Sequence, residues 1–122
     1  MQTNPVALTA EAKGRQGQLI DLLPYLNTSL FSCSVANAFF ISDNAVLISI
    51  SGLTSANAGI NEVTFDNLPF QFAYFTACYL FKDVYLGADD PNKTLLMPSG
   101  NSIISQHPAN VNCSGQGVFS VF

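Results

Sequence analysis

The run from Gln71 to Lys82, QFAYFTACYLFK, limits the folds open to this chain more than any other segment. It has the length of a β-strand, and large apolar side chains fall on both of its alternating faces. A strand of an antiparallel sheet usually has one apolar face and one face in water. We therefore predict a strand over residues 71–82 that is covered twice, by the core of its own chain on one side and by another copy of the chain on the other.

Four aromatic side chains of this run are candidates for the contact between copies. Strict alternation would place Phe72 and Tyr74 on one face and Phe75 and Tyr79 on the other. Their rings carry large apolar area, and the tyrosine hydroxyls suit the edge of an interface. We expect these four residues to be buried in the core or between subunits.

Alternating apolar residues continue on both sides of this run. Residues 35–42 and 45–51 alternate around the turn sequence Asp43-Asn44, which is typical of a β-hairpin. Turn sequences separate further short strands, which are predicted at 62–65, 84–86, 94–97, 102–105 and 118–122. This spacing predicts an all-β domain, an antiparallel β-sandwich or jelly roll, with the C-terminal strand inside a sheet.

Residues 1–33 differ from the rest and are predicted to form a separate N-terminal part, with the β-domain over 34–122. Apolar residues at roughly helical spacing over 18–23 indicate a short helix, which Pro24 would end. Nearby glycines weaken that helix. An extended stem, or an arm laid on a neighbouring subunit, is the alternative.

The composition favours a protein that assembles and disfavours one that binds nucleic acid. Only 10% of the residues are charged, against about 25% in an average soluble protein. A free monomer this poor in charge would have weak colloidal protection. Four basic residues at a net charge of -4 cannot form a basic stripe along nucleic acid. We expect the chain to bury much of its surface against copies of itself.

The sequence carries neither a membrane signal nor a secretory one. No apolar run reaches 18 residues, so no membrane insertion is predicted. The first residues lack the basic start and apolar run of a secretory signal peptide. Cys33, Cys78 and Cys113 are far apart, which predicts free thiols in a reducing compartment. A disulfide between two of them is the alternative.

No motif for catalysis or metal binding occurs in the sequence. His107 is the only histidine, and no serine lies in a G-x-S-x-G sequence, although a Cys–His pair that meets in space stays open. Asp89, Asp90 and Asn92 form the only acidic cluster, and their spacing fits a turn rather than a calcium loop. We predict a protein that is not an enzyme and takes no metal or cofactor.

Five segments follow one another in a distinctive order from Ala38 to the C-terminus. They are AFFISDNAVLISISGLTSANAGINEVTFDNLP, the apolar strand, VYLG, TLLMPSGNSI and GQGVFSVF. This order resembles the C-terminal receptor-binding domains of phage tail-fibre and baseplate proteins. The resemblance implies a homotrimeric β-sandwich tip of a virion tail, assembled in the bacterial cytoplasm, that binds a host-surface glycan or protein.

On that reading, polar loops at one end of the domain would contact the ligand. Binding residues concentrate on loops that a rigid scaffold holds in place. The candidate loops span 52–59, 87–93 and 107–116. The candidate contact residues in them are Asn57, Asp89, Asp90, Asn92, Asn110 and Asn112.

Two other functions fit the same sequence. A virion structural or decoration protein would assemble in the same way without binding a receptor. A carbohydrate-binding module or small hydrolase domain would be a monomer with a groove lined by exposed aromatic side chains.

Overall fold

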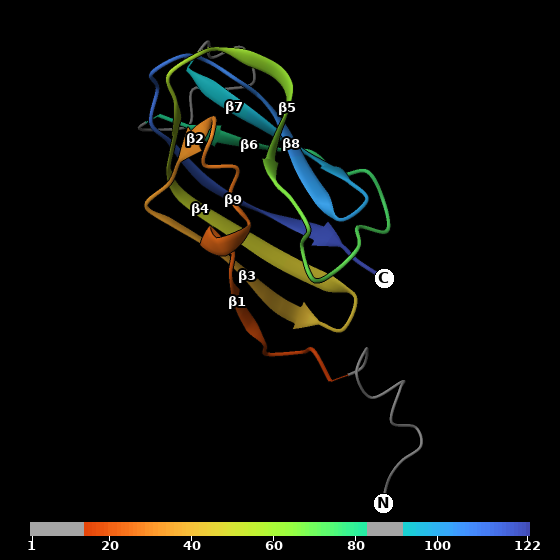
Figure 1. Cartoon of the computed structure of the whole chain (residues 1–122). Coiled ribbons are helices and arrows are strands. Elements are labelled where there is room, and N and C mark those ends of the chain that lie inside the picture. The colour runs from red at the N-terminus through yellow and green to blue at the C-terminus, as the bar shows by residue number, and fades with distance from the viewer. Residues whose placement is uncertain (1–13, 83–91) are drawn as a thin grey trace, which may run out of the picture.

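The computed structural model describes residues 14–82 and 92–122, and these residues form an all-β fold, as predicted (Figure 1). One short 3₁₀ turn, η1 (Leu23–Tyr25), accompanies nine strands. The strands are β1 (Leu19–Asp21), β2 (Phe31–Ser32), β3 (Val35–Ser42), β4 (Ala45–Ser55), β5 (Gly59–Phe65), β6 (Cys78–Phe81), β7 (Lys93–Ser99), β8 (Ser102–His107) and β9 (Cys113–Ser120). No helix in the described residues is long and apolar enough to cross a membrane.

The strands follow one curled antiparallel path in the order β1-β3-β4-β9-β6-β7-β8-β5, with β2 paired to β4 beside it. Figure 1 shows β4 and β9 in the middle of the molecule, between β1 and β3 on one side and the β6-β7-β8-β5 group on the other. The finer assignment to a sandwich or a jelly roll stays a prediction.

The two ends of this path meet. The segment that follows β1 and η1 bridges β5 through Leu26 and Phe65. The amide of Asn27 donates to the Thr64 carbonyl at 2.8 Å, and the amide of Asp66 donates to the Tyr25 carbonyl at 2.9 Å. Because these bonds satisfy backbone groups at the end of β5 and directly after it, the curled sheet lacks a free edge there.

The predicted hairpin is confirmed, and its second strand is longer than expected. β3 and β4 pair from Val35–Ser51 to Ser42–Ala45, with the turn at residues 43–44. β4 passes through Gly52 to Ser55 because a bulge between Ile50 and Leu53 absorbs the glycine, whose φ is +75°. The predicted loop 52–59 is therefore reduced to residues 56–58.

The predicted strand over residues 71–82 is wrong for most of its length. Only Cys78–Phe81 is a strand, and the strand pairing of residues 71–77 is limited to one isolated bridge between Phe72 and Val121. The next pair along is Phe81 with Ser114, so the eight residues 73–80 of this segment run opposite only six residues of β9, 115–120. The extra residues of this segment leave the strand ladder, and the alternation of side chains between the two sheet faces ends there.

The predicted alternation of faces fails for the same reason. Phe72 is 8% exposed, whereas Tyr74, predicted on the same face, is 72% exposed, and Phe75 is 71% exposed. Phe72 packs edge-to-face on Phe70 and Phe119, with ring centroids 5.5 Å apart in each pair. It therefore belongs to the chain's own core and leaves the set of interface candidates.

The two terminal regions gave opposite outcomes. The predicted helix over 18–23 is wrong, because Leu19–Asp21 pairs with β3 as a strand and Pro24 lies in the 3₁₀ turn. The C-terminal strand is confirmed inside the sheet, between β4 and β6. Its last regular residue is Ser120, and Phe122 beyond it is exposed.

The remaining strands follow the predicted order with shifted limits. β7 and β8 extend the strands predicted at 94–97 and 102–105, and β5 begins before 62. The predicted loop 107–116 shrinks to residues 108–112, because His107 ends β8 and Cys113 begins β9. The strand predicted at 84–86 lies outside the described residues.

Candidate functional site

One end of the sheet brings together segments that are far apart in the sequence. β4 ends there, β5 begins there opposite the end of β8, and β7 begins there opposite the end of β6. The cross-strand pairs Gly59–His107 and Phe81–Lys93 fix this arrangement. Loops 56–58 and 108–112 therefore lie at the same end as Asn92.

Four of the six predicted ligand contacts fall at this end, and two are outside the described residues. The amide of Asn110 donates to the Ser55 carbonyl at 2.7 Å, and the amide of Asn57 donates to the Ser55 hydroxyl at 3.4 Å. Asn112 lies in the same loop as Asn110, and the Asn92 carbonyl accepts from the Cys113 thiol at 3.6 Å. The predicted contacts that fall outside are Asp89 and Asp90.

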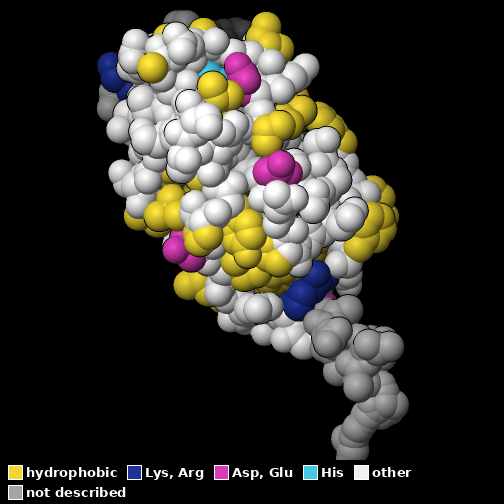
Figure 2. Space-filling model, viewed as in Figure 1, with side chains coloured by type: hydrophobic (Ala, Val, Ile, Leu, Met, Phe, Trp, Pro, Cys, Tyr) yellow, Lys and Arg dark blue, Asp and Glu magenta, His cyan; other side chains and the backbone are white. Residues whose placement is uncertain are grey.

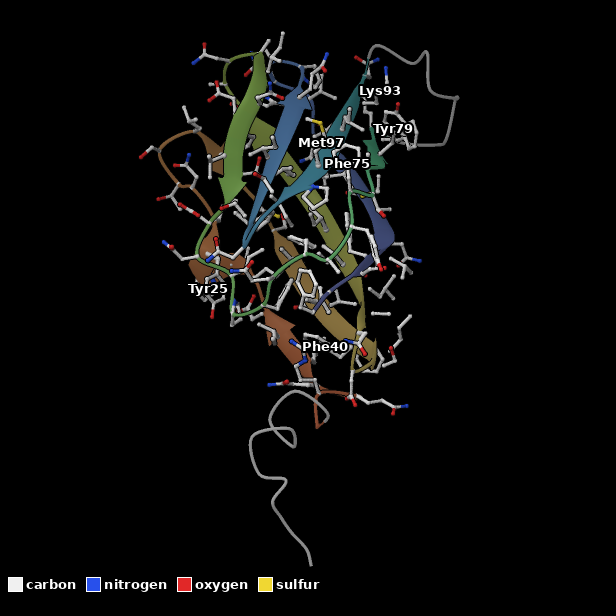
Figure 3. The ribbon with its side chains drawn as sticks, turned by 90° about the vertical axis from the view of Figure 1, so that its right-hand side faces the viewer. Tyr25, Phe40, Phe75, Tyr79, Lys93 and Met97 are labelled. Carbon is white, nitrogen blue, oxygen red and sulfur yellow. The ribbon has the colours of Figure 1, made fainter. Side chains whose placement is uncertain are left out.

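A hollow of about 860 Å³ opens beside these loops, on the outer side of the β6-β7-β8-β5 group. Its lining includes Ile60, Tyr79, Lys93, Leu95, Gln106 and His107. Within it, Tyr79 is the cross-strand partner of Leu95, and Leu95 is the partner of Gln106. The Lys93 ammonium lies 5.8 Å from the centroid of the Tyr79 ring, and Figure 3 shows the two side chains together.

His107 lies at the inner side of this hollow and is 7% exposed. Its ring packs edge-to-face on Phe31 at 4.7 Å, and its Nδ1 faces the Pro108 carbonyl at 3.4 Å. Its Nε2 is buried and has no hydrogen-bond partner among the described residues. A buried polar atom without a partner is uncommon in folded proteins and calls for an explanation.

The described residues do not assemble a nucleophile with a base. The Cys33 thiol donates to the carbonyls of Val35 and Ser51, and burial raises the pKa of this thiol. Burial also raises the pKa of Cys78 to about 11, which keeps it protonated and a poor nucleophile. Within residues 14–82 and 92–122, no three His, Cys, Asp or Glu side chains cluster as metal ligands would.

A second feature lies on the outer side of the β1-β3-β4-β9 group. Consecutive cross-strand pairs join four apolar side chains into one row across four strands: Leu19, Phe39, Leu47 and Val118. Leu19 is 62% exposed and Val118 is 50% exposed. We call these four residues the apolar row. The sequence did not reveal it, because its members become neighbours only through the pairing of β1 and β9 with the hairpin.

The surface around these features has little charge. Figure 2 shows yellow hydrophobic patches within white uncharged surface, interrupted by isolated Lys, Arg, Asp and Glu side chains. The row next to the apolar row consists of Asn37, Ser49 and Gln116, with Asp21 at its end. Tyr74, Phe75 and Tyr79 add aromatic surface elsewhere on the exterior.

The chain was compared with known proteins by family models, curated sequences and solved structures. None of the three comparisons finds a match. The resemblance to phage receptor-binding domains therefore stays a prediction.

Proposed function

We propose that this chain is a non-enzymatic attachment domain that assembles as a homotrimer and binds a host-surface receptor, as the tip of a phage tail does. The observation that carries the proposal is the uncovered apolar row on the outer side of the sheet. An antiparallel sheet can expose one face to water, and that face is then normally polar. Here Leu19, Phe39 and Val118 stand on it without a cover from the described residues.

A second copy of the chain is the occupant that best suits this face. The apolar row spans four strands, about 14 Å between the outermost ones at the usual strand spacing. On one side it is flanked by Asn37, Ser49 and Gln116, with Asp21 at the end of that row, and on the other side Ala45 pairs with Ser120. A partner of strong charge would gain nothing from such a face, whereas other copies of the chain carry the same uncharged surface and are present at the same concentration. The exposed Tyr74 and Phe75 enlarge the surface available to the copies.

Receptor binding is supported by the loops and the hollow at one end of the sheet. A trimer would present three such ends together, and simultaneous engagement strengthens attachment to a surface without any new contact. This is the arrangement that an attachment domain needs.

Adsorption to cells tests the proposal. Fluorescently labelled protein is incubated with a panel of bacterial strains, and the bound fraction is measured by flow cytometry. We expect saturable binding to some strains, and binding by Val118→Glu reduced at least tenfold because the copies separate. Leu30→Glu, at a residue that is also exposed but lies outside the apolar row, is the matched control and should bind like the natural chain.

The outcomes separate the competing functions. An assembled protein that binds no strain in the panel would favour a virion structural or decoration role. If the natural chain is a monomer and binds cells no more strongly than Val118→Glu does, a monomeric carbohydrate-binding module is favoured. Either result would overturn the proposal.

A further inference from the structure

We infer that Glu62 and His107 form a pH-operated latch, which joins the start of β5 to the end of β8 when the imidazole takes up a proton. The inference goes beyond the proposed attachment function and does not depend on it. Glu62 pairs with the buried Ser105, and His107 is itself buried, so both side chains belong to the inner face of the sheet. Tyr79 and Lys93 belong to the outer face.

The Glu62 side chain lies over Gly59 and beside the imidazole. Glu62 is half-buried, and a Cβ built on Gly59 would lie 2.5 Å from its Cγ and 2.6 Å from its Oε1. The same Cβ would lie 2.8 Å from Nε2 of His107, the cross-strand partner of Gly59. A carboxylate oxygen and an imidazole nitrogen therefore border one small space, which is available to Glu62 because Gly59 has no side chain.

When it is neutral, the imidazole presents an acceptor to this carboxylate. Nδ1 of His107 faces the Pro108 carbonyl at 3.4 Å, and a carbonyl can only accept, so we place the proton of the neutral ring on Nδ1. Nε2 then carries a lone pair, and it is buried without a hydrogen-bond partner among the described residues. Two acceptors cannot bond to each other, so the neutral pair leaves this buried nitrogen unsatisfied.

A proton on Nε2 turns the contact into an attraction. The ring then donates from both nitrogens, to the Pro108 carbonyl and to the Glu62 carboxylate, and a hydrogen bond between two charged groups is stronger than a neutral one. Histidine is the side chain that ordinarily changes its charge between about pH 5 and 8, and a carboxylate is ionised throughout that range. We therefore expect the latch to be closed at about pH 5.5 and open at about pH 8.

The other groups around the ring leave Glu62 as its partner. Phe31, which packs on the ring from β2, and the loop 108–112 carry no charge. Lys93 and Tyr79 are the other ionisable residues that line the hollow, and they stand on the opposite face of the sheet. Neither of them supplies a negative charge to the imidazolium at these pH values.

Closing the latch would tighten the bases of both loops at this end of the sheet. The loop 56–58 ends directly before Gly59, and the loop 108–112 begins directly after His107. The two loops are also linked through Asn110, whose amide donates to the Ser55 carbonyl at 2.7 Å. Mild acid therefore tightens the end of the domain that holds these loops, and mild alkali loosens it.

Nitrogen-15 NMR of the imidazole, on the whole chain, tests the inference. His107 is the only histidine, so its ring signals are identified at once. At about pH 8 the ring should carry its proton on Nδ1. As the pH is lowered, the amide signals of residues 56–58 and 108–112 should shift with the same midpoint as the ring. In Glu62→Gln that midpoint should fall by about one pH unit or more, because a neutral amide does not attract the imidazolium.

Asp21→Asn is the matched control, because Asp21 is an exposed carboxylate on β1, far from the latch in the sheet order. It should leave the titration of the ring unchanged. Glu62→Asp keeps the charge on a shorter side chain and should give a midpoint between those of the natural chain and Glu62→Gln. The position of the proton needs no variant, so the inference stays testable if Glu62→Gln does not fold. A proton on Nε2 at about pH 8, or an unchanged midpoint in Glu62→Gln, would overturn it.

Discussion

The two ends of the protein interior differ in chemistry. At the end near the β3–β4 turn the core is aromatic, with Phe40, Phe70, Phe72 and Phe119 stacked edge-to-face in a continuous series at 5.5 to 5.6 Å. At the opposite end, buried polar side chains take their place: Ser55, Thr94, Ser105 and His107. Figure 3 shows Phe40 at the first end and Tyr79 with Lys93 at the second.

The aromatic end is also tied down from outside. The Arg15 guanidinium lies 4.8 Å from the centroid of the Phe40 ring and donates to the carbonyls of Asp43 and Phe122. It thus joins the start of the described chain, the hairpin turn and the last residue. The comparison indicates that one end of the fold supplies stability, while the other keeps polar groups and open space that a ligand can use.

The largest expected effect is at the aromatic end. Phe119 is fully buried and packs on Phe72. Phe119→Ala removes that contact and leaves a cavity, and it should lower the free energy of unfolding by about 3–5 kcal/mol. Urea denaturation followed by circular dichroism measures the change. A loss below about 1 kcal/mol would show that the aromatic series is not the stabilising part of the core.

Next in size is the pH dependence due to Cys78, in the middle of the sheet. Burial raises its folded pKa from the ordinary value of 9.0 to about 11. Its contribution to stability is therefore complete below pH 9 and is lost as the pH rises toward 11, by about 2–3 kcal/mol in all. Denaturation at pH 8 and pH 11 should show this fall in the free energy of unfolding of the natural chain. Between the same two pH values, the free energy of unfolding of Cys78→Ala should fall by about 2–3 kcal/mol less. Identical pH profiles would contradict the burial of this thiol.

The smallest expected effect is at the polar end. The hydroxyls of Thr64 and Ser105 are 2.6 Å apart and buried. Thr64→Val leaves the Ser105 hydroxyl with one partner fewer and should cost about 1–2 kcal/mol. When Ser105→Ala is added to Thr64→Val, it should lower the free energy of unfolding by less than it does in the natural chain, because the hydroxyl that it removes has already lost its partner. Strictly additive losses in the double-mutant cycle would show that the two hydroxyls do not interact.

The parts of the fold that the sequence predicted well are those determined by neighbouring residues. Alternation around Asp43-Asn44 is a local signal, and it placed both strands of the hairpin within a few residues. The apolar C-terminal end likewise predicted a strand inside the sheet. Local periodicity is sufficient for elements of this kind.

The parts that it missed depend on strands that are distant in the sequence. The run 71–82 alternates well enough to predict one long strand, but residues 73–80 lie opposite only six residues of β9, and residues 73–77 are not in the ladder. The helix over 18–23 fails because β1 finds a partner in β3. Neither the pairing of this run with β9 nor the pairing of β1 with β3 can be predicted from the pattern of neighbouring residues.

The candidate site was predictable only in its coarse position. The sequence predicted that polar loops gather at one end of the domain, and residues 56–58 and 108–112 do lie near one another at one end. The approach of His107 to Gly59 arises from the register of β5 on β8, which the sequence does not reveal. The apolar row depends in the same way on three cross-strand pairings.

The central claim is that copies of the chain cover the apolar outer side of the sheet, and sedimentation equilibrium tests it most directly. The natural chain is measured over a hundredfold dilution, beside Val118→Glu. The account predicts a species of three times 13.1 kDa for the natural chain and of 13.1 kDa for the variant. A natural chain that sediments at 13.1 kDa throughout the dilution series would contradict it.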